Sequence, residues 1–224
     1  MSGTFFEYCD GYRIEVDIPK QFSYKEGNVN DGYVIENDEG DQYIRIPAGY
    51  TSDGMYVRGF WISRYEISML KQEGIPRSIP KQIPLVYVNF NMAVELAKMV
   101  GGVLPNKEDY NRICMWLVET RAATFEEVFV GGSDRGNYTE PFVLACTASV
   151  PNQMVNRLDN FFGNCHIWTT EKSELYDYHR VIRGGHGLSY KTGKNYPPSQ
   201  RAWANPEEGR SDLTFRIVMR DSKE

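Results

Sequence analysis

Apolar and polar residues alternate in several stretches of the first seventy positions, which is the period-two pattern of half-buried strands. The first stretch runs from residue 11 to 18 and places Ile14 and Val16 on the same side. Two shorter stretches, 33–35 and 43–46, flank an acidic turn. This order predicts a β-hairpin with a loop of about four or five residues.

The segment 59–68, with the sequence GFWISRYEIS, predicts a further strand. Phe60 and Ile62 fall on one side of it and Trp61 on the other, because successive side chains of a strand point to opposite faces. We expect one of these two faces to lie in the core.

The apolar period changes to that of a helix after position 90. For the first helix we expect Asn91 as the N-cap and Gly101 with Gly102 as the stop. Its apolar stripe consists of Ala93, Leu96, Ala97 and Val100.

A second helix is expected after Asn106, which stands at capping-box spacing from Asp109. A short third helix is expected from Thr124 to Val130, where Thr124 and Glu127 have the same spacing. The apolar stripe of the second helix consists of Tyr110, Ile113, Cys114 and Leu117.

The composition is that of an ordinary globular protein. The 224 residues are 41% hydrophobic and carry a net charge of -5, with no dense run of Lys and Arg to release counterions from a phosphate backbone, so we expect no nucleic acid partner. No stretch approaches the roughly 18 to 20 apolar residues of a membrane span. Because charged residues occupy the N-terminus, we expect neither membrane insertion nor a signal peptide.

Groups that could bind a metal are scattered along the chain. The four cysteines, at positions 9, 114, 146 and 165, lack the two-residue spacing of zinc sites, so we expect reduced and mostly buried thiols. His166, His179 and His186 lie in separate segments, which favours separate roles over a shared metal. The acidic turn 37–41 lacks the ligand spacing of an EF-hand.

Four segments resemble the formylglycine-generating-enzyme family, a variant of the C-type lectin fold. In that family a Gly-Asn-x-x-x-Trp strand, an Arg-Gly-Gly turn and a Phe-Arg strand frame a ligand surface built from loops. The matching segments here are 59–68, 103–110, 163–185 and 213–219. The resemblance implies an α+β, C-type-lectin-like fold with a twisted antiparallel sheet, two main helices and long irregular loops.

The same resemblance bears on domain organisation and chemistry. We expect an N-terminal β-hairpin layer over residues 1–55 and the lectin-like domain over 56–224, forming one unit. The family's enzyme binds copper(I) with two cysteines just past the Gly-Gly turn, but 184–195 contains no cysteine, so we expect no enzyme activity. The family's calcium site would use Asn164, yet Ile167 stands where its Glu would be, so we expect no cofactor.

The polar C-terminal loop is the remaining candidate site, because Trp, Tyr and Arg carry most of the binding energy in interfaces. We expect a non-catalytic ligand-binding protein, similar to phage or prophage adhesins and to the variable proteins of diversity-generating retroelements. The expected ligand-binding residues are His166, Thr170, Glu171, His186, Ser189, Tyr190, Lys191, Lys194, Asn195, Tyr196, Gln200, Arg201, Trp203 and Asn205.

The expected partner is a cell-surface protein or a glycan, with a location at a phage tail or a bacterial surface. Two alternatives stay open. One is a structural virion component that contacts neighbouring tail subunits or further copies of itself. The other is an oxidase that recruits ligands from Cys114, Cys146 or Cys165.

Overall fold

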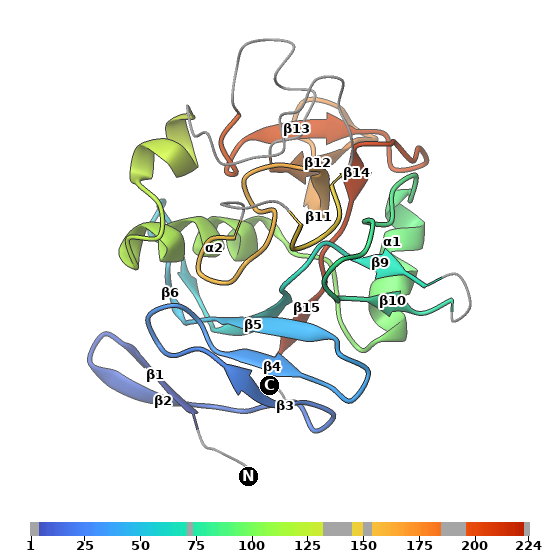
Figure 1. The fold of residues 1–224 in the computed structure, drawn as a ribbon. Coiled ribbons are helices and arrows are strands. Elements are labelled where there is room, and N and C mark those ends of the chain that lie inside the picture. Colours follow the sequence, from blue (N-terminus) through green and yellow to red (C-terminus); the bar gives the residue numbers. More distant parts are fainter. Residues whose placement is uncertain (1–4, 71–73, 132–144, 150–153, 185–195, 222–224) are drawn as a thin grey trace.

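Two sheets of different size organise the molecule. The computed structural model describes residues 5–70, 74–131, 145–149, 154–184 and 196–221. In Figure 1 a five-stranded sheet occupies the lower half and a four-stranded sheet the upper half, with helix α2 between them on the left and helix α1 on the right. The protein is thus a sheet-rich α+β structure.

The five-stranded sheet is antiparallel throughout. Val34 pairs with Ile44 across the predicted hairpin, which is therefore confirmed. In spatial order its strands are β15 (Val218–Arg220), β8 (Phe60–Ser63), β5 (Gln42–Ile46), β4 (Val34–Glu36) and β3 (Ser23–Glu26).

The central strands β4, β5 and β8 of this sheet are buried on both faces, whereas the edge strand β3 is exposed. Ile44 and Ile62 belong to a core cluster that includes residues of α2, whereas Tyr43 and Trp61 belong to a second cluster that includes residues of α1. The expectation of one core face for the segment 59–68 is wrong, because all four residues of β8 are buried. Neighbouring side chains along each strand alternate between the two clusters, as the pleat requires.

Three helices follow in the middle of the chain, and their N-terminal caps are local. The capping box of Asn106 and Asp109 is confirmed, and so are the reciprocal contacts of Thr124 and Glu127. The cap of the first helix is Asn89 and not Asn91, since the Asn89 side chain accepts from the backbone N–H of Met92. The helices are α1 (Phe90–Met99), α2 (Lys107–Glu119) and a one-turn π-helix, η1 (Glu126–Val130).

The four-stranded sheet has the order β13 (Arg201–Ala204), β12 (Arg180–Arg183), β11 (His166–Lys172) and β14 (Leu213–Thr214). The segment 213–219, expected as one strand, is divided between the sheets. β14 pairs with β11 in the upper sheet and β15 pairs with β8 in the lower one. This segment therefore ties the two sheets together.

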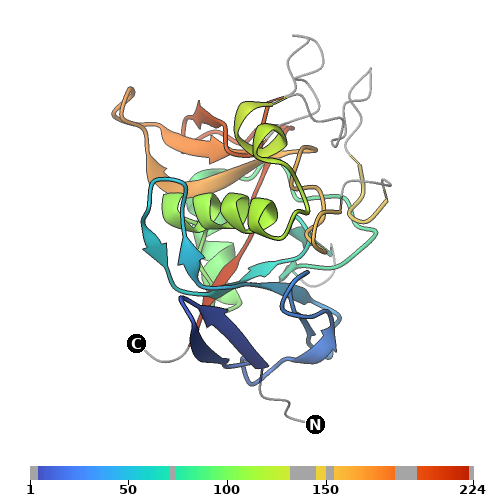
Figure 2. The ribbon, with the colours of Figure 1, turned by 90° about the vertical axis from the view of Figure 1, so that its left-hand side faces the viewer.

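Three two-stranded ribbons complete the described fold. The first ends in an Asp10-Gly11 turn in which both residues have positive φ, of 51° and 80°, as two-residue hairpins prefer. Figures 1 and 2 place this hairpin at the end of the molecule opposite the four-stranded sheet. The ribbons are β1 (Phe5–Cys9) with β2 (Tyr12–Val16), β6 (Gly49–Tyr50) with β7 (Tyr56–Val57), and β9 (Ser68–Met69) with β10 (Pro76–Arg77).

The thiols agree with the expectation from spacing. All four cysteines are free, Cys114 and Cys165 are buried, and Cys9 and Cys146 are partly buried. Within the described ranges, every helix is too short or too polar to cross a membrane.

Candidate functional site

A buried carboxylate, Glu66, holds the segment that leads into the candidate site. Glu66 Oε2 accepts hydrogen bonds from Nδ2 of Asn160 and of Asn164, at 2.8 and 2.7 Å. Its Oε1 accepts from the backbone N–H of Cys165 at 3.1 Å. Full burial raises the pKa of Glu66 to about 7, against the opposing effects of Arg216 and the two amides. These bonds fix the segment that leads into β11.

A buried guanidinium supports the same region. Arg216 Nη1 donates to the carbonyls of Ser63 and Arg64, each at 3.0 Å, and Nη2 donates to the carbonyl of Asp159. The side chain is fully buried, and burial lowers the pKa of Arg216. Two of the residues that carry the family resemblance, Asn164 and Arg216, thus hold loops in place beneath the surface.

An ion-pair cluster connects three strands at the surface. Glu171 lies between two guanidiniums, with Arg183 Nη2 at 2.8 Å and Arg201 Nη2 at 2.7 Å from its carboxylate oxygens. Arg183 also donates to the carbonyl of Ser199 at 2.6 Å. The Glu171 side chain is only 8% exposed, and a buried carboxylate needs paired positive charges. Glu171 therefore holds the guanidinium of Arg201 in position.

A pocket of about 270 Å³ opens next to this cluster. It combines the amide of Gln200, the guanidinium of Arg201 and the indole of Trp203, a mixture that can both stack against a ligand and donate hydrogen bonds to it. We call it the C-terminal pocket; it is lined by His166, Tyr196, Gln200, Arg201, Ala202, Trp203 and Arg210.

The sequence predicted five of these lining residues: His166, Tyr196, Gln200, Arg201 and Trp203. They converge although β11 and β13 are not adjacent, because β12 between them sets the spacing. His166 is buried, with Nδ1 2.7 Å from the carbonyl oxygen of Gly184. It therefore forms part of the wall and is not an exposed group.

The other predicted residues lie elsewhere. Thr170 is exposed on β11, and its backbone N–H donates to the carbonyl of Pro105. Asn205 belongs to the next turn, where its Oδ1 accepts from the N–H of Glu207 and its Nδ2 donates to Glu208. The predicted residues His186, Ser189, Tyr190, Lys191, Lys194 and Asn195 lie outside the described residues.

The sequence-based prediction left out Arg210, Ala202 and an aromatic loop beside the pocket. The ring of Tyr176 packs against Trp203 with centroids 5.9 Å apart, and Leu175 and Tyr178 are exposed on the same loop. Two tyrosines in the polar stretch 173–179 could have indicated this loop from the sequence, because recognition loops are rich in Tyr.

The residues around Asn164 do not fit calcium. Its Oδ1 accepts a hydrogen bond from the backbone N–H of Ala145 at 3.0 Å, its Nδ2 donates to Glu66, and the side chain of Ile167 offers no oxygen. A calcium ion prefers six to eight oxygen ligands, several of them anionic. Within the described ranges, no three His, Cys, Asp or Glu side chains gather as metal ligands.

The buried cysteines do not fit copper(I) as they stand. Burial raises the pKa of the Cys114 thiol to about 12 and that of Cys165 well above its usual value. Copper(I) binds the thiolate form. Burial therefore makes the thiolate of either cysteine harder to form than that of an exposed thiol.

The fold of this chain is similar to the folds of several solved structures. No protein-family model and no curated protein sequence matches the chain. Among solved structures, it is similar to Treponema denticola variable protein 1, with a TM-score of 0.56 and 14% identity over 91% of this chain and 100% of that one.

Two further structures share the fold. PvdO from Pseudomonas aeruginosa has a TM-score of 0.54 and 14% identity, over 84% of this chain and 97% of that one. CarF has a TM-score of 0.55 and 15% identity, over 79% and 97%. The resemblance to formylglycine-generating-enzyme-like and variable proteins is thus confirmed, and at these identities it concerns the fold.

Proposed function

We propose that the chain is a non-catalytic ligand-binding protein with a C-type-lectin-like scaffold, and that the C-terminal pocket and its rim hold the ligand. The observation that carries this proposal is the convergence of five predicted binding residues on one pocket. The Glu66 hydrogen bonds fix the segment that leads into His166, and the Glu171 ion pair holds Arg201. Preorganisation of this kind lowers the entropic cost of binding.

The charges around the pocket favour binding over acid–base chemistry. Arg201 is paired with Glu171, and Arg210 donates to both carboxylate oxygens of Asp212, at 2.8 and 2.6 Å. Guanidiniums held in this way serve as fixed planar donors. The raised pKa values of the Cys114 and Cys165 thiols and the lack of a cysteine in the sequence 184–195 support the same reading.

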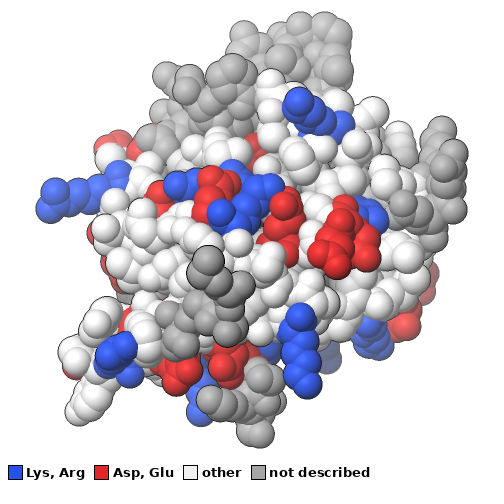
Figure 3. Space-filling model, turned by 60° about the horizontal axis from the view of Figure 1, so that its bottom comes forward, with Lys and Arg blue, Asp and Glu red and all other residues white. Residues whose placement is uncertain are grey.

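The proposed partner is a cell-surface protein or a glycan, and the proposed setting is a phage tail or a bacterial surface, as for a variable protein. Figure 3 shows Lys and Arg side chains interspersed with Asp and Glu on the face turned to the viewer, without a basic stripe. This favours partners other than nucleic acid. We propose no cofactor, and a single unit for residues 1–55 and 56–224.

The test uses labelled protein on a panel of intact bacterial cells and on a glycan array. Trp203→Ala combined with Gln200→Ala removes the stacking surface and an amide donor, so we expect at least a tenfold loss of binding. Tyr12→Ala, an exposed tyrosine at the other end of the molecule, is the control. Unchanged binding by the double variant, with an unchanged circular dichroism spectrum, would refute the location of the site.

A second assay separates binding from oxidase chemistry. With copper and a cysteine-containing peptide, we expect no oxygen consumption above that of the free metal. Turnover that disappears in Cys165→Ser would overturn the non-catalytic proposal.

A further inference from the structure

A second, larger depression lies at the opposite end of the molecule from the C-terminal pocket. Its volume is about 600 Å³, and it lies between the turn of the β1–β2 hairpin, strand β6, the loop at 29–30 and one side of α2. Figure 2 shows this side, with the hairpin below, α2 above it and the β6–β7 ribbon beside them. We call it the hairpin pocket.

Aromatic rings form the walls of the hairpin pocket. Tyr8 is 64% exposed and Tyr50 is 44% exposed, although large aromatic side chains usually bury most of their surface when nothing else binds them. The Tyr50 hydroxyl donates to Asp10 at 2.8 Å, which holds the ring at the rim. Both rings are therefore presented to solvent, and that of Tyr50 is held in position.

The floor contains an unsatisfied donor. Trp116 is 1% exposed, and its indole N–H has no hydrogen-bond acceptor among the described residues. Buried donors in native proteins nearly always have a partner, but this nitrogen has almost no exposed surface, so a ligand in the pocket would not reach it. The indole therefore serves the pocket as an apolar floor.

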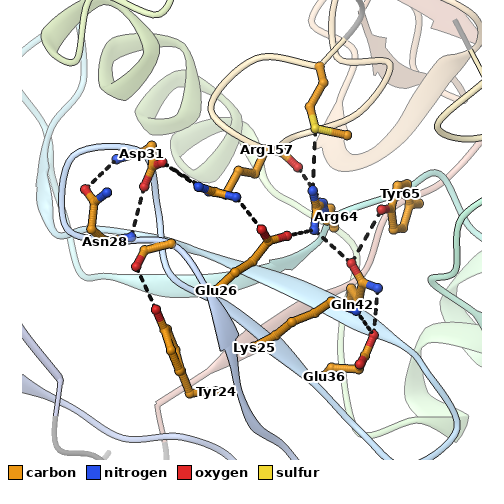
Figure 4. Close-up of polar contacts among 12 residues, drawn as sticks. Tyr24, Lys25, Glu26, Asn28, Asp31, Glu36, Gln42, Arg64, Tyr65 and Arg157 are labelled. Carbon is orange, nitrogen blue, oxygen red and sulfur yellow. Dashed lines mark hydrogen bonds and ion pairs between the residues drawn. The ribbon is translucent and has the colours of Figure 1, made fainter. Parts of the chain in front are cut away.

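The other walls are rigid. Arg112 is buried and donates to both carboxylate oxygens of Glu119, at 2.9 and 2.8 Å, and to the carbonyl of Pro47 at 3.0 Å. Figure 4 shows the loop on the far side, where Arg157 donates to Asp31 and the backbone N–H of Asn28 donates to the same carboxylate. The loop residues between them are thereby held against the pocket.

The charges of the lining balance. Asp10 and Glu119 carry negative charge, and Arg112 and Arg121 carry positive charge. A strongly charged ligand would gain no net attraction here. An apolar peptide would cover these polar groups without giving them hydrogen bonds, which is unfavourable.

We propose that the hairpin pocket binds one neutral sugar residue, a hexose or an N-acetylhexosamine. A sugar ring has an apolar C–H face that packs on a tyrosine ring. Its hydroxyls can donate to Asp10 and Glu119 and accept from the exposed guanidinium of Arg121. The volume lies in the range of small-molecule sites, of about 300 to 1,000 Å³.

The test is calorimetric and NMR titration of the full chain with glucose, galactose, mannose, N-acetylglucosamine and N-acetylgalactosamine. We expect at least one of them to bind, with a dissociation constant raised roughly tenfold in Tyr8→Ala through loss of the stacking surface. Tyr12→Ala is the matched control, because Tyr12 is 75% exposed on the same hairpin and lies outside the pocket lining.

Three outcomes decide the matter. Binding that is weakened by Tyr8→Ala but unchanged in Tyr12→Ala and in Trp203→Ala supports the proposal. Absence of binding by every sugar, or equal affinity of wild type and Tyr8→Ala, overturns it. Sugar binding that is lost only in Trp203→Ala assigns the sugar to the C-terminal pocket and also overturns it. Failure here leaves the function proposed for the C-terminal pocket intact.

Discussion

The protonation of Glu66 predicts an unusual pH dependence of stability. Burial raises the pKa of this carboxyl to about 7 in the folded protein, compared with 4.5 for an ordinary glutamate. Between these two pH values the folded state binds more protons than the unfolded state. The stabilising contribution is therefore fully present below pH 4.5 and is lost as the pH rises through about 7.

The size of the effect follows from the two pKa values. At about 1.36 kcal/mol per pH unit, the difference between 4.5 and about 7 corresponds to roughly 3 kcal/mol. Glu66→Gln removes this titration. The glutamine side chain of the variant keeps one acceptor oxygen, but its NH₂ group faces N–H donors of Asn160, Asn164 or Cys165. Because two donors cannot bond to each other, we expect the variant to be less stable than wild type at pH 5.

The assay is urea unfolding of wild type and Glu66→Gln between pH 5 and pH 8. We expect the stability difference between them to shrink by about 2.5 kcal/mol over this range. The carboxyl of Asp159, whose pKa burial also raises, titrates in both proteins and does not enter the difference. Glu95→Gln, an exposed change on α1, should follow wild type at every pH. A difference for Glu66→Gln that stays constant across this range would refute the reasoning.

Three further substitutions test other parts of the scaffold by thermal or urea unfolding. Arg45→Met leaves the buried carboxylate of Glu7 without its partner at 3.0 Å, and we expect a loss of about 3 to 5 kcal/mol; a variant as stable as wild type would contradict this. Asn106→Ala breaks the capping box of α2 and should lose about 1 kcal/mol, most of it regained by a serine there. Gly102→Ala would place its Cβ 2.3 Å from Cγ2 of Ile217, with an expected loss of about 1 to 3 kcal/mol, whereas Gly54→Ala has open space around its Cβ and costs only the strain of its positive φ of 81°.

The elements that the sequence predicted well depend on neighbours only a few residues away. The capping box at Asn106 and the contacts of Thr124 with Glu127 each join residues three positions apart. The β4–β5 hairpin needs only a turn between two alternating stretches. The same local logic applies to the Asp10-Gly11 turn, which is a strong hairpin signal that our prediction did not use.

The candidate site could be predicted as a set of residue types and not as a geometry. Gln200, Arg201 and Trp203 stood out because amides, guanidiniums and indoles are suited to binding. That Arg201 is held by Glu171, and that His166 lies in the wall of the pocket, depends on the order of strands in the sheet. No short pattern encodes that order.

The sequence by itself determined the described helices, the caps at Asn106 and Thr124, the β4–β5 hairpin and the segments that resemble a known family. The tertiary structure alone decided that both faces of the central strands of the five-stranded sheet are buried and that 213–219 divides between two sheets. It also placed Glu66 against Asn164, 98 positions away. The physical reason is that burial and pairing between distant residues depend on how the elements pack, whereas caps and turns are satisfied by the chain's nearest neighbours.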